Sequence, residues 1–330
     1  MKTVNMGMIG CGGISSSHIA AYRSLTSKIK VVAVCDAIEE KAKAAMKNVG
    51  AEIHYIDYSK LLERSDIEAV DICLPHDLHS PVAVAATEHG KHVLCEKPMA
   101  RSLEEADAMI AAAERNGVKL QIGENFRFIP EVVKARQLIR DGSIGEVFLA
   151  KTDCVGFPTD LAPSVWKLDA SRVGGGVVID SGIHFVDIMR WIVGEVSSVT
   201  AQLNRRVRKE ISGEDTGCLI FKHTNEAISM LTLTWAAKRP FGEYLFKVYG
   251  SHGTIVSGEG GVQVLRDDKP NEVSKIDIEP KDSFRAEIEH FADCITHDTQ
   301  PLMNGKEARR DLELVIAAYR SAKTGETVRV

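Results

Sequence analysis

Two aspartates and a histidine stand in a mainly apolar segment near the middle of the chain. Residues 174 to 191 read GGGVVIDSGIHFVDIMRW, in which Asp180, His184 and Asp187 are surrounded by aliphatic and aromatic residues. On a helix that turns by about 100° per residue, the three fall within about 60° of one another. Because an unpaired buried charge is costly, we expect this polar stripe to face partners or a cavity.

The stripe suits the oxidation of a secondary alcohol. A histidine that titrates near neutrality can remove the hydroxyl proton as hydride leaves carbon, so we predict that His184 is the principal acid–base residue. Asp180 would orient the imidazole or hold a second substrate hydroxyl. Asp187 would either bond to His184 or make a structural bond behind it. The alternative is a structural role, in which His184 is a core histidine with its own hydrogen-bond partners and Asp180 only caps the helix.

This segment raises two further questions: the role of the glycines at 174 to 176, and whether its polar side chains bind a metal. The glycines would either let the chain approach a nicotinamide closely or form a mobile start to the helix. One histidine and two aspartates could ligate a cation, but hydride transfer needs none and no second histidine has suitable local spacing. We therefore predict no metal.

A lysine after a second apolar run is the next candidate for a catalytic residue. The segment DICLPHDLHSPVAVAATEHGKHVLCEKPMA contains two strands that end near Leu74–Pro75 and Glu96–Lys97. Ligands collect beyond the carboxyl ends of strands in doubly wound sheets. Pro98 restricts Lys97 to extended geometry, and a lysine beside a nicotinamide could bond a substrate hydroxyl and favour its alkoxide. A surface lysine at a strand end is the alternative.

A glycine-rich turn at the start of the chain predicts the cofactor. VNMGMIGCGGISSSHIAAY places Gly10, Gly12 and Gly13 between a strand and a helix, with Ile14 at the opening of the helix and Ser15 in the third position of the G-x-G-x-x-G/A pattern. Gly10 permits the tight turn, Gly12 allows close approach of a pyrophosphate, and the helix N-terminus offers free N–H groups.

The strand that follows this turn indicates which dinucleotide is bound. VVAVCD ends in Asp36, whose carboxylate can accept hydrogen bonds from adenosine ribose hydroxyls and would repel a 2′-phosphate. No arginine follows in AIEEKAK, so we predict NAD in preference to NADP. The alternative is a cluster of turn glycines with a surface carboxylate.

These residues require two kinds of sheet to hold them. Short β-rich runs alternate with helical patterns in the first third, which predicts a parallel sheet with helices on both faces. Several strands without intervening helices follow, which predicts an antiparallel sheet. We predict an α/β Rossmann domain over residues 1–123 and an α+β substrate and oligomerisation domain over residues 124–330, with a ligand cleft at their junction.

Composition excludes several classes of partner. The 330 residues carry a net charge of −5 with scattered lysines and arginines, so we expect neither nucleic acid nor a membrane surface as a partner. Only Met1 to Thr3 precede the first apolar run, and no stretch approaches the roughly 18 to 20 apolar residues of a membrane span. We expect a cytoplasmic protein whose seven cysteines are mostly buried reduced thiols.

Several motifs together resemble those of one family. MIGCGGIS, GKHVLCEKPMA, GENFRFIP, GGGVVIDSGIHFVDIMRW and FRAEIEHFADCI are similar to motifs of the family of glucose–fructose oxidoreductase, inositol dehydrogenase and the rhizopine-catabolism protein MocA. The resemblance implies a Rossmann domain, a domain with a large open antiparallel sheet often used in oligomerisation, and hydride transfer between NAD(P) and a sugar or polyol. It also implies that Lys97, Asp180 and His184 are the catalytic residues.

Further contacts follow from the resemblance and from position. Trp166 and Lys167 lie in a segment that reaches cofactor or substrate in the family, although the family often has Trp-Arg there; a buried tryptophan with a surface lysine is the alternative. Asn125 and Arg127 in GENFRF would line the pocket, or Arg127 would pair with an acidic group across the junction. His79 would approach the nicotinamide or serve a structural role.

The resulting hypothesis is an NAD-dependent dehydrogenase that acts on a sugar, glycoside or cyclic polyol such as an inositol. The alternatives are a reductase or redox-neutral enzyme of the same family and a non-catalytic dinucleotide sensor. An open sheet needs its exposed face covered, which predicts a homodimer or homotetramer. Specificity is expected to reside in the second domain's sheet face and in loops such as residues 155–164.

Overall fold

The computed structural model describes residues 3–159, 165–238, 244–258 and 261–330. The chain forms two compact units. The first contains Met1–Asn125 and Asp282–Arg309, and the second contains Phe126–Lys281 and Arg310–Val330. The sequence predicts one boundary after residue 123, so the structure differs from that prediction in giving residues 282–309 to the first unit.

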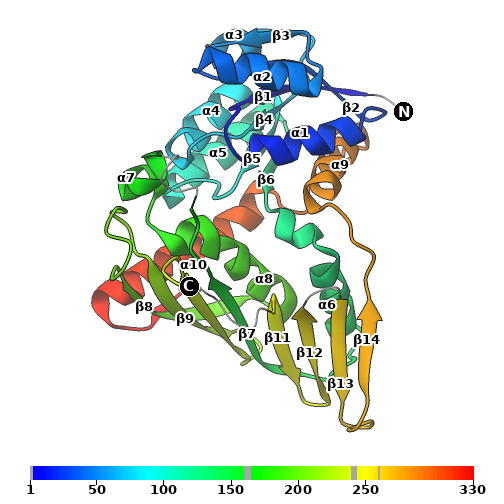
Figure 1. Cartoon of the computed structure of the whole chain (residues 1–330), viewed down its shortest axis with the longest axis vertical. Helices are drawn as coiled ribbons and strands as arrows, with labels where there is room; N and C mark the ends of the chain where they lie inside the picture. The colour runs from blue at the N-terminus through cyan, green and yellow to red at the C-terminus, as the bar shows by residue number, and fades with distance from the viewer. Residues whose placement is uncertain (1–2, 160–164, 239–243, 259–260) are drawn as a thin grey trace. The chain divides into compact units, whose positions relative to one another are not determined.

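The first unit is built on a six-stranded parallel sheet in the order β3-β2-β1-β4-β5-β6 (Figure 1). Its strands are β1 (Val4–Ile9), β2 (Ile29–Cys35), β3 (Ile53–Tyr55), β4 (Ala69–Ile72), β5 (His92–Glu96) and β6 (Leu120–Gly123). The interior strands lack polar alternation because helices cover both faces of the sheet. The predicted doubly wound Rossmann fold is confirmed.

Local signals in the sequence delimit the helices of this unit. These helices are α1 (Ser15–Ser24), α2 (Glu39–Val49), α3 (Tyr58–Leu62), α4 (His76–Glu88), α5 (Leu103–Asn116) and α9 (Ser283–Thr296). The Ser102 hydroxyl accepts the Glu105 N–H at the start of α5, and Gly117, at φ 63°, ends that helix. Such caps satisfy backbone groups that a helix end leaves unpaired.

The return of α9 to the first unit has a packing cause. Ile288, Phe291 and Ala292 of α9 are buried in the same core as Met6, Met8 and Leu94 of the parallel sheet. Figure 1 shows orange α9 beside blue α1. Without α9, this apolar surface would face water, which is why a helix far along the chain completes the first unit.

The second unit contains a nine-stranded, mainly antiparallel sheet in the order β14-β13-β12-β11-β7-β10-β9-β8-β15. Its strands are β7 (Val147–Val155), β8 (Val196–Asn204), β9 (Thr216–His223), β10 (Ile228–Thr234), β11 (Phe246–Gly250), β12 (Gly253–Gly258), β13 (Gly261–Arg266), β14 (Val273–Asp277) and β15 (Val328–Arg329). Among the pairings of this sheet in the described residues, only the β7–β10 pair is parallel.

Helices pack on one face of this sheet. The helical segments of the second unit are η1 (Asn125–Phe128, whose first residue belongs to the first unit), α6 (Pro130–Arg140), η2 (Val165–Leu168), α7 (Ala170–Val173), η3 (Val178–Gly182), α8 (Ile183–Val193) and α10 (Gly305–Thr324, which starts in the first unit). Burial alternates along β9 and β10, so one face is covered and the other is exposed.

Within the described residues, no helix has the length and apolar character that a membrane span requires. The cysteines are all free thiols. Cys35, Cys73, Cys95 and Cys294 are buried, Cys11 and Cys154 are half-buried, and Cys218 is exposed. Burial raises the pKa of the Cys11 thiol to about 12, which keeps it protonated at neutral pH.

Candidate active site

The glycine-rich turn leaves space for a ligand above the start of α1. Gly10 has a φ of 95°, and a Cβ there would lie 2.3 Å from the Cys73 carbonyl oxygen, so only glycine fits. A Cβ on Gly12 or Gly13 would meet nothing within 4 Å. Gly13 and Ile14 are exposed. The turn therefore fits a pyrophosphate that lies against main-chain N–H groups.

Asp36 is held beside this turn by two main-chain donors. Its Oδ2 accepts the Cys11 N–H at 2.8 Å and its Oδ1 accepts the Ile38 N–H at 2.8 Å. Each carboxylate oxygen keeps a further acceptor position, because an ionised carboxylate offers about four in all. Asp36 therefore both fixes the turn and fits two ribose hydroxyls.

Parallel pairing gathers the predicted cofactor residues of the first unit at one edge. Gly10, Asp36, Leu74 and Lys97 each follow a strand, and β2, β1, β4 and β5 are neighbours in the sheet. Asn125, two residues beyond β6, donates to the Ser283 hydroxyl at 2.8 Å. Leu74, Pro75 and Lys97 are half-buried, as residues that line a ligand site often are.

The side chain of Glu96, a residue predicted to lie at the cofactor, is bonded within the first unit. Its Oε1 lies 2.9 Å from His18 Nε2, and its Oε2 accepts the Lys97 N–H at 3.1 Å. The other His18 nitrogen lies 2.8 Å from Asp71 Oδ2, which also accepts the Tyr22 hydroxyl at 2.8 Å. The carboxylate of Glu96 thus points into the unit because a buried histidine binds it there.

We name His18, Tyr22, Asp71, Glu96 and Glu287 the histidine cluster. Both oxygens of the Glu287 carboxyl lack a hydrogen-bond partner among the described residues, and the side chain is fully buried. Burial, with Glu96 adding to it, raises the pKa of Glu287 well above its ordinary value. Burial alone would lower the pKa of His18, but Asp71 outweighs it and the pKa is raised. These directions favour the protonated form of both Glu287 and His18.

His79 has a structural environment. Its side chain is fully buried, with Nδ1 2.8 Å from the Pro98 carbonyl oxygen and Nε2 2.8 Å from the Leu74 carbonyl oxygen. Burial lowers its pKa to about 4, so the neutral ring donates to one of the two carbonyls. His79 thus lies between the segments that follow β4 and β5, which supports the structural role, one of its two predicted alternatives.

In the second unit, Asp180 lies on a π-helix rather than on a regular helix. η3 spans Val178–Gly182, and the α-helical hydrogen bonding resumes with α8 at Ile183. Asp180 is 5% exposed, and Lys167 Nζ lies 3.4 Å from its Oδ2. Trp166 is half-buried beside Lys167. The predicted stripe assumed a constant 100° per residue, which a π-helix does not follow.

His184 lies in the first turn of α8 against an aromatic ring. The Phe126 and His184 ring centroids are 4.1 Å apart, with an angle of 11° between the planes. His184 is half-buried. Its imidazole therefore has one covered face and an orientation set by a flat neighbour, which suits a group that must present one nitrogen to a substrate.

Arg127 pairs with an acidic group, Asp187, which is one of the two alternatives predicted for it, although this partner lies in the same unit. Arg127 Nε and Nη2 donate to Asp187 Oδ1 at 2.8 and 2.7 Å, and both side chains are 0% exposed. Of the alternatives for Asp187, the structure supports the structural bond. Arg190 Nε donates to buried Asp311 at 2.7 Å, and we name Arg127, Asp187, Arg190 and Asp311 the arginine cluster.

The glycines before η3 serve close packing. A Cβ on Gly175 would lie 2.0 Å from the Tyr319 hydroxyl, and one on Gly176 would lie 2.1 Å from the Glu214 carbonyl oxygen. The Tyr319 hydroxyl and the Val178 N–H both donate to Glu214 Oε1, at 2.9 and 3.0 Å. Tyr319 and Glu214 thereby anchor the segment that carries Asp180.

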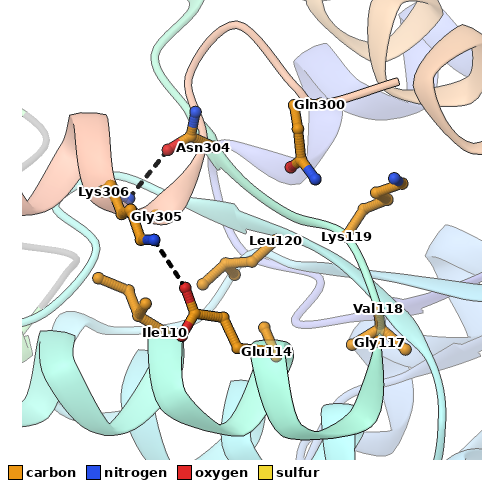
Figure 2. A pocket seen from close by; sticks show the side chains of 11 residues that line it. Ile110, Glu114, Gly117, Val118, Lys119, Leu120, Gln300, Asn304, Gly305 and Lys306 are labelled. Atoms are coloured by element: carbon orange, nitrogen blue, oxygen red, sulfur yellow. Dashed lines mark hydrogen bonds and ion pairs between the residues drawn. The ribbon is translucent and has the colours of Figure 1, made fainter. Parts of the chain in front are cut away.

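A surface hollow in the first unit lies elsewhere. It is bounded by the end of α5, the amino end of β6 and the start of α10, with Glu114 bonded to Lys306 at 2.8 Å (Figure 2). Because the strands are parallel, the amino end of β6 is opposite the edge that carries Gly10 and Lys97. None of the predicted site residues lines this hollow.

Sequence reasoning missed the aromatic and buried neighbours of the site. Phe126 stood in the quoted motif GENFRF, but helical spacing within one segment does not reveal a contact with His184. His18 and Glu287 are 269 positions apart, and only the fold brings them together. In the loop of residues 155–164, where specificity is expected to reside, residues 160–164 lie outside the described residues.

Family models match both parts of the chain. Residues 4–124 match the oxidoreductase family with an NAD-binding Rossmann fold, and residues 132–256 match the GFO/IDH/MocA C-terminal domain. These two matches cover well over half of the chain.

Named relatives and a solved structure agree with these matches. The chain is 30% identical to a D-apiose dehydrogenase of Paraburkholderia graminis, over 99% of this chain and 90% of that protein. It is 27% identical to a myo-inositol 2-dehydrogenase of Thermotoga maritima, over 99% and 98%. An oxidoreductase from Agrobacterium radiobacter, solved with NAD+, L-tartaric acid and magnesium, superposes with a TM-score of 0.91 at 27% identity, over 99% and 98%.

Proposed function

Because the chain belongs to the GFO/IDH/MocA family of NAD-binding oxidoreductases, we propose that it is an NAD-dependent dehydrogenase of a sugar, glycoside or cyclic polyol. Its relatives are named as dehydrogenases that act on sugar and polyol CH–OH groups. The observation that carries the proposal is one edge of the parallel sheet, where an open glycine turn, Asp36 and Lys97 follow strands β1, β2 and β5.

The cofactor residues have separate roles in this proposal. The main chain at Gly12 and Gly13 would hold the pyrophosphate, and Asp36 would accept the ribose hydroxyls. The carboxylate of Asp36 would lie against a 2′-phosphate, and that repulsion supports NAD over NADP. When bound, the dinucleotide would supply the hydride acceptor at its nicotinamide ring.

The proton of the substrate hydroxyl would be handled by three side chains. His184 would accept it at a ring nitrogen, and the Lys97 ammonium would stabilise the negative charge that develops on the substrate oxygen. Asp180 would hold an adjacent hydroxyl or orient the imidazole. The Lys167 Nζ lies 3.4 Å from Asp180 Oδ2, and this contact supports a carboxylate that is held in one position.

The substrate class rests on the relatives and on the polar groups of the site. A polyol presents several hydroxyls, and Asp180, His184 and Lys167 offer both acceptors and donors for them. We propose that the enzyme removes hydride from a carbon that carries a secondary hydroxyl, as in an inositol or the ring form of an aldose. D-apiose, myo-inositol, scyllo-inositol and simple aldoses form the first panel of test compounds.

The deciding experiment follows NADH absorbance when the protein is mixed with NAD and this panel. Turnover with at least one compound supports the proposal, and NAD binding with no turnover across a broad panel supports a dinucleotide sensor instead. His184→Ala should then lower kcat by roughly 10² to 10⁴-fold while the Kd for NAD stays close to that of the wild type. Near-normal turnover of this variant would overturn the assigned role of His184.

A matched pair of variants tests the cofactor preference. Asp36→Ser removes the negative charge and should weaken NAD binding while it strengthens NADP binding, measured as the two Kd values by fluorescence of the reduced forms. Glu40→Ser, a change of an exposed carboxylate in the first turn of α2, serves as the control and should leave the Kd ratio unchanged. An Asp36 variant that leaves the ratio unchanged would contradict this role.

Self-association is proposed from the exposed face of the nine-stranded sheet. Ile220, Ile228 and Met230 are 44%, 44% and 47% exposed there, which is unusual for large apolar side chains on neighbouring strands. A homodimer or homotetramer would cover them. Light scattering coupled to size exclusion measures the mass, and a monomer at micromolar concentration would contradict the proposal.

A further inference from the structure

The stack of Phe126 on His184 belongs to a larger set of contacts between η1 and α8. Besides its parallel contact with His184, the Phe126 ring meets the Phe185 ring edge-on, with centroids 5.7 Å apart and planes at 77°. Two successive residues of α8 therefore hold the phenyl ring from two directions. Parallel and edge-on contacts are both preferred arrangements of aromatic rings.

The next residue on η1 prevents this ring from moving away. Arg127 is bonded to Asp187 inside the unit, and its guanidinium lies 4.1 Å over the ring of Trp191. Breaking that pair would leave a buried charge without compensation. Adjacent residues of η1 thus bind positions 184, 187 and 191 of α8, which lie on one side of a helix at i, i+3 and i+7 spacing.

We propose that Phe126 is a positioning residue for His184: its ring covers one face of the imidazole and fixes the plane in which the ring nitrogens lie. The inference rests on the proposed function, in which His184 exchanges the proton of the substrate hydroxyl. That exchange needs a ring nitrogen within about 2.6 to 3.2 Å of the hydroxyl oxygen, so a ring free to rotate is in the wrong plane for part of the time. An aliphatic side chain of similar volume has no flat face to set the plane.

The first arm of the test observes the stack without substrate or cofactor. In protein labelled with ¹³C-histidine, the His184 ring protons should resonate upfield because they lie over the phenyl ring. A His184→Asn sample identifies the signal among the eleven histidines of the chain. Phe126→Leu should remove the upfield shift, and Phe126→Tyr, which keeps a flat ring, should retain it. Phe126→Met serves as a second aliphatic variant should the leucine variant fail to fold.

The second arm measures turnover with NAD and the panel compound that gives the fastest NADH formation. Phe126→Leu should lower kcat roughly ten- to a hundredfold, the usual result of a small misplacement in an active site, with little change in KM for NAD. Phe126→Tyr should restore kcat to within about threefold of the wild type. Phe246→Leu, at a fully buried phenylalanine of β11, is the control: it should lower Tm and leave kcat and the His184 signal unchanged.

The outcomes separate the inference from the proposed function. Turnover that survives His184→Ala overturns the assigned role of His184 and, with it, the inference, while the proposed dehydrogenase function stands. Turnover that is lost in His184→Ala but kept in Phe126→Leu overturns the inference alone, as does a His184 signal that Phe126→Leu does not move. Loss of kcat in Phe126→Leu and Phe126→Met, together with recovery in Phe126→Tyr, supports it.

Discussion

The two units each contain a cluster of buried charges, and the clusters differ in what supplies the positive charge. In the histidine cluster, one imidazole lies between the carboxylates of Asp71 and Glu96 at 2.8 and 2.9 Å. In the arginine cluster, two guanidiniums face Asp187 and Asp311, each at 2.7 Å. A guanidinium keeps its charge at any pH that a protein tolerates, whereas an imidazolium loses its proton.

This difference teaches that burial alone does not say how a cluster depends on pH. Burial, with Asp187 close by, raises the pKa of Asp311, much as burial raises that of Glu287. Only the histidine cluster has a cation that can also lose its charge. The stabilisation from His18 is complete below the unfolded pKa of about 6.5 and is lost as pH rises through its raised pKa in the fold.

The largest expected effect comes from removing a permanent charge. Arg127→Met leaves the Asp187 carboxylate buried and unpaired, so we expect a loss of about 3 to 5 kcal/mol in the free energy of unfolding. Trp166, Trp191 and Trp235 all belong to the second unit, so the midpoint of urea unfolding by tryptophan fluorescence reports on it. Arg127→Met/Asp187→Leu should regain most of the loss, and a double variant no more stable than the single one would contradict this reason.

The next effect lies in the pH dependence of the first unit. The unfolded chain releases the Glu287 proton above a pH of about 4.5 whereas the folded chain keeps it, so rising pH costs up to about 1.4 kcal/mol per unit. Between pH 5 and 7, the wild type should lose about 2 to 3 kcal/mol of free energy of unfolding for this reason, and Glu287→Gln should not. Hydrogen exchange of the β4 and β5 amides measures this free energy.

A neighbouring glutamate on α9 provides the control for that slope. Glu289 pairs with Lys28 at 2.9 Å and is 35% exposed, so Glu289→Gln should leave the slope as in the wild type. Equal slopes for the wild type and Glu287→Gln would mean that Glu287 is ionised in the fold and that its carboxyl has found a partner.

A smaller effect is expected at Tyr22, which is the neutral hydrogen-bond donor of the histidine cluster. Tyr22→Phe removes one hydrogen bond to the Asp71 carboxylate, which His18 still contacts, so we expect a loss of about 1.5 kcal/mol in the same exchange measurement. The control is Tyr55→Phe, because the Tyr55 hydroxyl accepts only a long 3.5 Å bond from Arg64. A loss in Tyr22→Phe no larger than in this control would show that the Tyr22 bond does not stabilise the cluster.

The smallest effect concerns the outer edge of the arginine cluster. The Arg136 guanidinium lies 3.3 Å over Trp191, whose ring also carries Arg127. Arg136 is half-buried and has water available, so Arg136→Gln should cost only about 0.5 to 1 kcal/mol in urea unfolding. A loss as large as that of Arg127→Met would mean that the contact of Arg136 with Trp191 stabilises the unit as much as the pair of Arg127 with Asp187 does.

Patterns within short segments predicted the fold well. The alternation of strands and helices predicted the Rossmann sheet, and the run of strands predicted the mainly antiparallel sheet; both predictions are confirmed. Because parallel strands end at one edge, the sequence also placed Gly10, Asp36 and Lys97 together. These inferences succeed because the physical cause of each is local: a turn glycine, an acidic strand end, a lysine before proline.

The rest depends on contacts between distant residues. α9 resembled a helix of the second unit by its position, and only the apolar core shows that Ile288 and Phe291 belong with Met6. A π-helix is not visible in hydrophobic spacing, so Asp180 and His184 were assigned to one regular stripe. For Arg127, the substrate pocket and an acidic partner both stayed open, because no pattern within GENFRF reveals a buried aspartate sixty residues later.

The return of α9 also bears on the order in which the molecule is made. The ribosome releases the strands of the parallel sheet first, yet the helix that closes their core begins at Ser283. The chain of the second unit up to Lys281 has by then been synthesised. A nascent first unit therefore waits with apolar surface uncovered during most of translation, and an excised fragment of residues 1–125 should bind chaperones or aggregate for the same reason.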